Sequence, residues 1–178
     1  MNDVSHNTEK STAVPAMSPA KGLLVLIGVV VVVGGFIALC AALGIKEFWG
    51  GFLFLLYWSG IEHMKFERLP HCISGALLGL LLSYLLFALP IWLGEIGGVV
   101  FLGLILVVVY CQIMGWFSVA VNMTAMLFLT VGTIPAVQTG ADFAGVLAAL
   151  VLGILYFVGL LWGANKLKQR KVGPVVAS

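Results

Sequence analysis

Long apolar stretches, separated by short groups of polar or charged residues, dominate this sequence. Between Lys21 and Lys46 no Asp, Glu, Lys or Arg occurs, and the same holds between Glu95 and Asp142. A helix that crosses a bilayer needs about 20 apolar residues, and lipid forces even β-branched runs into helices because no other backbone partners exist. The pattern predicts six membrane-spanning helices, at residues 22–44, 47–62, 71–89 (ended by Pro90), 92–112, 115–133 and 142–164.

The two ends of the chain differ from these stretches. Residues 1–20 are polar, contain two prolines and show no apolar period, which predicts a disordered tail. The run 22–44 is too long for the apolar region of a signal peptide, so we expect an uncleaved first span. Residues 166–178 form a basic tail that would hold the last helix at anionic lipid. The six-span membrane domain is therefore predicted over residues 21–165.

Composition supports the same class of protein. The chain has 178 residues, of which 62% are hydrophobic and only 9% charged, whereas a soluble domain carries about 25% charged residues. We therefore predict an all-α integral membrane bundle with membrane lipid as its first partner. The net charge of +2 gives no support for nucleic-acid binding. Three cysteines at scattered spacings are read as small apolar residues in helices.

Basic residues are distributed unevenly between the two sides that six spans would create. One side would hold eight of the nine Lys and Arg residues, in the two tails and in the loop 63–70, while Lys46 alone lies on the other. Cytoplasmic segments are enriched in Lys and Arg. Both termini are therefore predicted to be cytoplasmic.

The spans also show hints of an internal repeat. Small residues recur every fourth position in the third and sixth predicted spans, as Gly75, Gly79 and Ser83 in one and as Gly145, Ala149 and Gly153 in the other. Small side chains at this spacing let helices approach closely in lipid, so these residues are predicted to form helix contacts or an oligomer interface. A three-span repeat has an odd number of spans, which requires the second copy to be inverted.

The predicted span 115–133 is the long apolar segment with an amide at its centre. On a continuous helix, Gly115, Ser118, Asn122 and Thr133 would share one face about 60° wide. We interpret Asn122, Ser118 and Thr133, with Tyr57 and Ser59 of the second span, as candidates for a polar path. Interhelical hydrogen bonding is the alternative role for each of them. Other neutral polar groups in the predicted spans are Ser83, Tyr84, Gln112, Thr124 and Thr130.

The loop 62–72 holds two histidines, a cysteine and two carboxylates, but its spacing matches no strong metal-ligand pattern. We expect a solvated loop at the membrane surface; a metal-binding sensor is the alternative. Glu95 is expected near the external surface, and Asp142 is predicted to cap the last span. Residues 134–140, with Pro135 and Gly140, form either an external connection or a re-entrant loop.

The predicted membrane interior contains no Asp, Glu, Lys, Arg or His, which argues against a proton relay. No phosphate-binding loop, Ser/His/Asp set or HExxH motif occurs. We therefore expect no catalytic residue, no cofactor, no bound metal and no enzymatic activity.

The pattern resembles a family of small bacterial inner-membrane proteins catalogued as domain of unknown function 1097. The similarity lies in the Trp49-Gly50-Gly51-Phe52 opening of the second span, the Gly75–Gly79 helix and the region 130–145 with its Pro135. This chain departs from the family in its polar N-terminal tail and in lacking a Pro-Gly pair at 135–136. The resemblance implies a bacterial inner-membrane location and carries no catalytic residues across.

Two functions remain after these exclusions. The first is a passive channel or permease-like conduit for a small neutral solute, because the predicted interior is uncharged and has a polar face. The second is a structural or accessory subunit that packs against a larger membrane complex, or against a second copy, through its glycine faces. The sequence names no substrate.

Overall fold

The computed structural model describes residues 19–140 and 142–171, and every regular element in these ranges is a helix. Most of the tail predicted over residues 1–20 lies outside the described residues. The chain divides into two units, residues 1–35 and 36–178. The first unit contributes the beginning of α1 (Pro19–Ala42).

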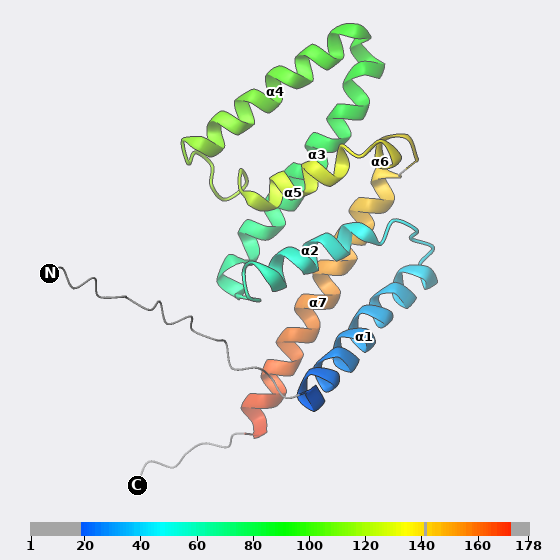
Figure 1. The fold of residues 1–178 in the computed structure, drawn as a ribbon, viewed down its shortest axis with the longest axis vertical. Coiled ribbons are helices and arrows are strands. Elements are labelled where there is room, and N and C mark those ends of the chain that lie inside the picture. Colours follow the sequence, from blue (N-terminus) through cyan, green and yellow to red (C-terminus); the bar gives the residue numbers. More distant parts are fainter. Residues whose placement is uncertain (1–18, 141, 172–178) are drawn as a thin grey trace, which may run out of the picture. The chain divides into compact units, whose positions relative to one another are not determined.

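The second unit holds the other helices, and they pack in pairs. Helix α5 lies beside α3, α2 lies beside α7, and α4 folds back on α3 (Figure 1). The bounds are α2 (Trp49–Gly60), η1 (Phe66–Arg68), α3 (Leu69–Leu93), α4 (Glu95–Ile113), α5 (Met123–Gly132), α6 (Pro135–Gly140) and α7 (Phe143–Lys171).

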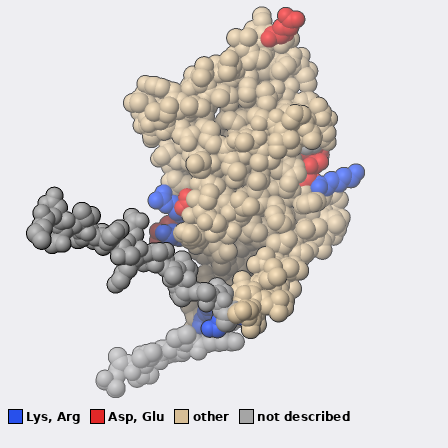
Figure 2. Space-filling model, in the orientation of Figure 1, with Lys and Arg blue, Asp and Glu red and all other residues tan. Residues whose placement is uncertain are grey.

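Four of these helices, α1, α3, α4 and α7, are long and apolar enough to cross a membrane. Figure 2 shows broad uncharged areas over the helices, with charged side chains in a few separate places. These features indicate a membrane-embedded protein. Helix α2 has 12 residues and α5 has 10, so they rise about 18 and 15 Å, well short of the 30 Å hydrocarbon core. Six complete spans are therefore not confirmed.

The expected continuous helix over 115–133 is wrong. Residues 114–122 form turns and bends, and the helix begins only at Met123. Gly115 has φ +69° and Phe117 has φ +54°, and these left-handed conformations interrupt any α-helix. Gly115, Ser118, Asn122 and Thr133 therefore do not share one helical face.

Two helices extend beyond the predicted spans. Helix α3 passes through Pro90 and ends at Gly94, which has φ +63°. Proline is tolerated inside membrane helices when neighbouring groups satisfy the freed backbone atoms. Helix α7 continues to Lys171, so the first six residues of the predicted tail 166–178 are helical.

The short helices contact the long ones through small residues. A Cβ atom added to Gly79 of α3 would lie 2.6 Å from Cβ of Phe128 on α5. A Cβ added to Gly153 of α7 would lie 2.7 Å from Cα of Gly51 on α2, and Ala149 is fully buried in the same contact. Gly75 faces the start of α5, and Gly145 faces Asp142 and Glu47. All six ladder residues, Ser83 included, thus lie where helices or helix ends meet within one chain.

Apolar side chains fill the space between α3, α4 and α5. The buried members of this core are Leu82, Phe101, Val108 and Leu129, with half-buried Leu, Ile, Val and Met residues around them. On the other side of the unit, Phe36 packs on Phe157 of α7 with ring centroids 4.9 Å apart. The three cysteines are free thiols in α1, α3 and α4. The apolar core between α3, α4 and α5 holds α5 against α3. The candidate site lies at the start of α5, beside the first half of α3.

Candidate functional site

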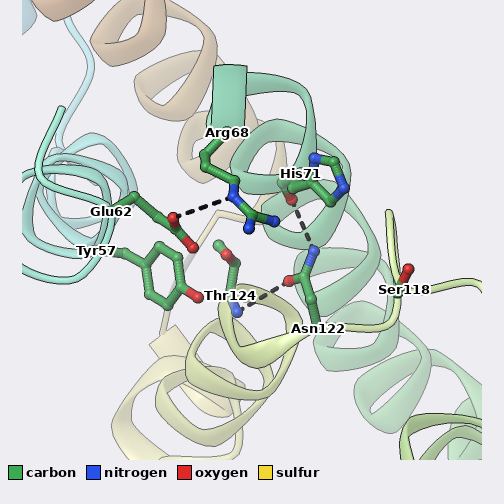
Figure 3. Close-up of a pocket in the computed structure, with 7 residues that line it drawn as sticks. All are labelled: Tyr57, Glu62, Arg68, His71, Ser118, Asn122 and Thr124. Carbon is green, nitrogen blue, oxygen red and sulfur yellow. Dashed lines mark hydrogen bonds and ion pairs between the residues drawn. The ribbon is translucent and has the colours of Figure 1, made fainter. Parts of the chain in front are cut away.

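A polar cavity lies at the N-terminal end of α5. Its volume is about 130 Å³, and its lining comes from α2, the 61–68 loop, α3, the irregular segment 114–122 and α5 (Figure 3). The lining residues are Tyr57, Glu62, Arg68, His71, Ser118, Asn122 and Thr124. Segments that are distant in sequence therefore converge on one polar space in an otherwise apolar protein.

Asn122 occupies the N-cap position of α5. Its side-chain oxygen accepts hydrogen bonds from the backbone N–H groups of Thr124 at 3.0 Å and Ala125 at 3.2 Å. Its Nδ2 donates to the backbone oxygens of His71 at 2.8 Å and Val119 at 2.9 Å. The amide therefore has two acceptors for its N–H groups and two donors for its oxygen. Its main role is to join the start of α5 to α3 and to the preceding segment.

The irregular segment 114–122 is held by further bonds to its backbone. The Trp116 N–H donates to the Cys111 carbonyl at 2.8 Å, and the Val121 N–H donates to the Phe117 carbonyl at 2.8 Å. The Ser74 hydroxyl of α3 lies within hydrogen-bonding distance of the Val119 carbonyl. Irregular backbone is tolerated at membrane depth when protein groups satisfy it or when it lines a polar cavity. Several backbone groups of this segment are bonded to protein, and its Ser118 and Asn122 line the polar cavity.

Charged side chains enter the cavity from the 61–68 loop. The Nε of Arg68 lies 3.9 Å from Oε2 of Glu62, and Figure 3 shows the guanidinium between Glu62 and Asn122. The loop is anchored by Trp58, whose Nε1 donates to the Lys65 carbonyl at 3.1 Å. Arg68 is 57% exposed and Glu62 23%. The ion pair therefore lies at the solvent side of the cavity.

Nδ1 of His71 is buried without a hydrogen-bond partner among the described residues. The hydroxyl of Thr124, which is only 1% exposed, lies beside the Tyr57 hydroxyl and the Cys72 thiol. Buried polar groups of this kind commonly complete their hydrogen bonds with ordered water or with a bound ligand.

The five candidates for a polar path separate into two sets. Tyr57, Ser118 and Asn122 line the cavity. Ser59 is half-buried on α2 and lies outside the lining. Thr133 follows the other end of α5, about 16 Å along the helix from Asn122, and its hydroxyl donates to the Thr130 carbonyl at 2.7 Å.

Sequence reasoning missed Glu62, Arg68 and His71, because the loop 62–72 reads as solvated. One signal for His71 was present. It precedes Gly75 by four residues, so His71, Gly75, Gly79 and Ser83 share one face of α3. Since that face receives α5, the imidazole falls at the start of α5.

The structure also bears on three further expectations from the sequence: a metal site in the loop 62–72, a helix cap at Asp142 and the conformation of residues 134–140. Among residues 19–140 and 142–171, no three His, Cys, Asp or Glu side chains gather closely enough to hold a metal ion. Asp142 caps α7, as predicted, because its Oδ1 accepts from the Ala144 N–H at 3.0 Å. In the segment 134–140, Nε2 of Gln138 on α6 donates to the Ser83 carbonyl at 3.1 Å. The connection between α5 and α7 is thereby joined to α3.

Comparisons with known proteins do not identify the chain. No family model matches it, no curated protein matches it, and no solved structure matches it. The resemblance to domain of unknown function 1097 gains no support from these searches. The functional argument therefore rests on the cavity.

Proposed function

We propose that this chain is a membrane conduit for a small neutral polar solute and that the cavity at the start of α5 is its solute site. The observation that carries the proposal is a cavity that polar side chains from α2, α3, α5 and the segments between them line, beside a half-length helix. Half-length helices that end beside irregular backbone are typical of substrate sites in transporters. The ion pair of Glu62 and Arg68 leaves no net charge on the carboxylate and guanidinium together, which favours an uncharged solute.

The order of the helices is compatible with an internal repeat of two halves, which is part of this proposal. The order α1, α2, η1, α3 is followed by α4, α5, α6, α7, so each half contains a long helix, a short helix, a brief helical turn and a second long helix. The short helix of each half packs on the last helix of the other half, as α2 on α7 and α5 on α3. Within the described residues, the contact of α3 with α4 has no counterpart of similar extent between α7 and α1, so the correspondence covers only part of the packing.

The orientation we propose has both termini in the cytoplasm. Phe143 at the start of α7 packs on Phe87 late in α3, with ring centroids 6.0 Å apart, so the two helices run in opposite directions. Lys65 and Arg68 beside the start of α3 then lie on the same side as Lys166 and Lys168 near the end of α7. Basic residues favour the cytoplasmic side. Placement in a bacterial inner membrane rests on the family resemblance alone.

An accessory subunit is less favoured. The glycine faces of α3 and α7, which would dock on a partner, are occupied by α5 and α2 of the same chain. Docking on a larger complex or on a second copy would have to use other surfaces.

The test is solute flux into liposomes that contain the purified full-length protein. Stopped-flow light scattering would compare urea, formamide and glycerol in protein-containing and empty liposomes. Tyr57→Phe removes one hydroxyl from the cavity, and Tyr110→Phe is the matched control because Tyr110 is exposed on α4, packed on Trp116.

We expect faster flux of at least one solute with the protein, a reduced rate for Tyr57→Phe and an unchanged rate for Tyr110→Phe. Flux equal to that of empty liposomes for every solute would contradict a conduit. Flux that Tyr57→Phe leaves unchanged would contradict this cavity as the solute site.

A further inference from the structure

We infer that the cavity selects neutral solutes of the urea and amide class, which carry N–H donors and a carbonyl acceptor on one small planar frame. This inference rests on the proposed function and names its substrate class. It follows from the inventory of donors and acceptors that the lining leaves free, from the compensated charge and from the volume.

The lining offers donors to a carbonyl oxygen. The hydroxyl of Thr124 is buried beside the Tyr57 hydroxyl and the Cys72 thiol, and the Tyr57 hydroxyl lines the same cavity. The guanidinium of Arg68 carries five N–H groups, and its one polar contact within the described residues is the 3.9 Å pair of Nε with Glu62. The backbone N–H groups of Thr124 and Ala125 are already bonded to Asn122, so the end of α5 offers little to a free anion.

The lining also offers acceptors to N–H groups. The carboxylate of Glu62 only accepts hydrogen bonds, and it lies in the cavity wall within ion-pair distance of Arg68. In a neutral imidazole one ring nitrogen is an acceptor, and the unpartnered Nδ1 of His71 is available for that role. A ligand that satisfies both sets needs an acceptor atom and N–H donors within a few ångströms, which is the geometry of an amide or of urea.

Charge and size narrow the class further. An anion beside Arg68 would lie close to the Glu62 carboxylate, and a cation beside Glu62 would lie close to the guanidinium, since the two groups are 3.9 Å apart. Each arrangement sets like charges near one another, which is unfavourable. A cavity of about 130 Å³ has room for a molecule the size of urea.

The test uses three planar molecules of almost the same size and shape but different charge. Urea is neutral, guanidinium carries +1 and nitrate carries −1. Their flux would be measured in the liposomes described above, with ionophores to compensate charge movement for the two ions. We expect protein-dependent flux of urea and none of guanidinium or nitrate.

Thr124→Val and Thr130→Val form a matched pair on α5. Valine replaces the hydroxyl by a methyl group of the same shape, and at position 124 it removes a buried hydroxyl whose neighbours within the protein are the Tyr57 hydroxyl and the Cys72 thiol. Thr130 is exposed and its hydroxyl donates to the Met126 carbonyl. Thr124→Val should lower urea flux about three- to tenfold, the effect of losing one hydrogen bond, and should cost about 1 kcal/mol of stability or less. Thr130→Val should leave urea flux unchanged.

The outcomes separate this inference from the proposed function. Protein-dependent flux of glycerol but not of urea or formamide would overturn the amide class and leave the conduit standing. Equal or faster flux of nitrate or guanidinium would overturn selection for neutral solutes. Urea flux that Thr124→Val leaves unchanged would overturn the role of the buried hydroxyl. Absence of flux for every solute would overturn the conduit itself.

Discussion

The two short helices both pack on long helices through glycines. In the contact of α2 with α7, a Cβ on Gly51 would lie 2.8 Å from the Ala149 carbonyl oxygen, and Gly153 of α7 faces Gly51. In the contact of α5 with α3, Gly75 and Gly79 of α3 receive larger side chains, and Gly132 of α5 faces Ser83. Both arrangements bring backbones close together, as expected in lipid.

The α2–α7 and α5–α3 contacts differ more in their hydrogen bonds than in their packing. The N-cap residue of α2 is Phe48, and it makes no side-chain cap bond. The N-cap residue of α5 is Asn122, which is bonded on both sides of its amide. The α3–α5 contact also includes the Ser83 hydroxyl, which donates to the carbonyls of Gly79 at 2.8 Å and Phe128 at 3.2 Å.

This difference explains where the cavity lies. Helix α5 begins at an irregular segment whose carbonyl groups need donors, so polar side chains gather there. Glycine at position 75 leaves space for them, because Cγ of Asn122 would lie 2.9 Å from an added Cβ. One short helix is therefore mainly a packing element, whereas the other also builds a polar site.

The largest expected effect comes from variants that disrupt the close packing of α2 on α7 and of α5 on α3. Gly79→Val and Gly51→Val each insert a branched side chain where an added Cβ already meets backbone atoms. Overpacking of this kind costs about 3 kcal/mol or more when backbone must move. Both variants should unfold well below the wild-type temperature in detergent micelles. Gly98→Val on α4 is the control, because open space surrounds Gly98, and a similar loss for the control would contradict the packing account.

The second-largest expected effect concerns α5 alone, because α2 has no side-chain cap to lose. Asn122→Leu removes the cap of α5 and leaves the carbonyls of His71 and Val119 without their donor. A lost cap costs about 1 kcal/mol and unpaired buried groups about 1–3 kcal/mol, so we expect a loss of about 3 kcal/mol. Asn122→Asp keeps the accepting oxygen and should lose about half as much. The measurement is thermal or denaturant unfolding in micelles.

Thr133→Val is the control for the Asn122 variants. Thr133 is exposed, and its hydroxyl donates to the Thr130 carbonyl of the same helix end. The variant should unfold at nearly the wild-type temperature. If Asn122→Leu behaved like Thr133→Val, the cap and its bridge to α3 would not be what holds α5 in place.

Hydropathy alone locates the long helices. An uncharged run of 20 or more residues in lipid has one favourable conformation, so α1, α3, α4 and α7 could be placed from sequence within four residues, except that α7 ends at Lys171 and not at the predicted residue 164. The break before α5 could not. Gly115–Asn122 is as apolar as its neighbours, and its conformation depends on His71, which is 51 residues away in sequence.

The charged lining of the cavity was hidden for a similar reason. Glu62 and Arg68 are ordinary members of a basic loop in sequence. They reach the rim of the cavity from a loop in which His63 and Met64 both adopt left-handed backbone conformations, with φ +51° and +58°, and in which Trp58 holds the Lys65 carbonyl. No periodic pattern predicts consecutive left-handed residues that are not glycine.

The smallest effect compares the start of α5 with the start of α7. Asp142 also caps its helix, but its Oδ1 accepts a hydrogen bond from the Ala144 N–H without a bridge to another helix, and the residue is exposed. Asp142→Ala should therefore cost about 1 kcal/mol, about a third of the loss for Asn122→Leu. Asp142→Asn should be nearly neutral, because asparagine caps as well as aspartate. Equal losses for Asp142→Ala and Asn122→Leu, measured in the same micelles, would mean that the bridge from Asn122 to α3 adds nothing beyond capping. The larger loss at Asn122 would instead show that the irregular segment and α3 are held as one unit through that single amide.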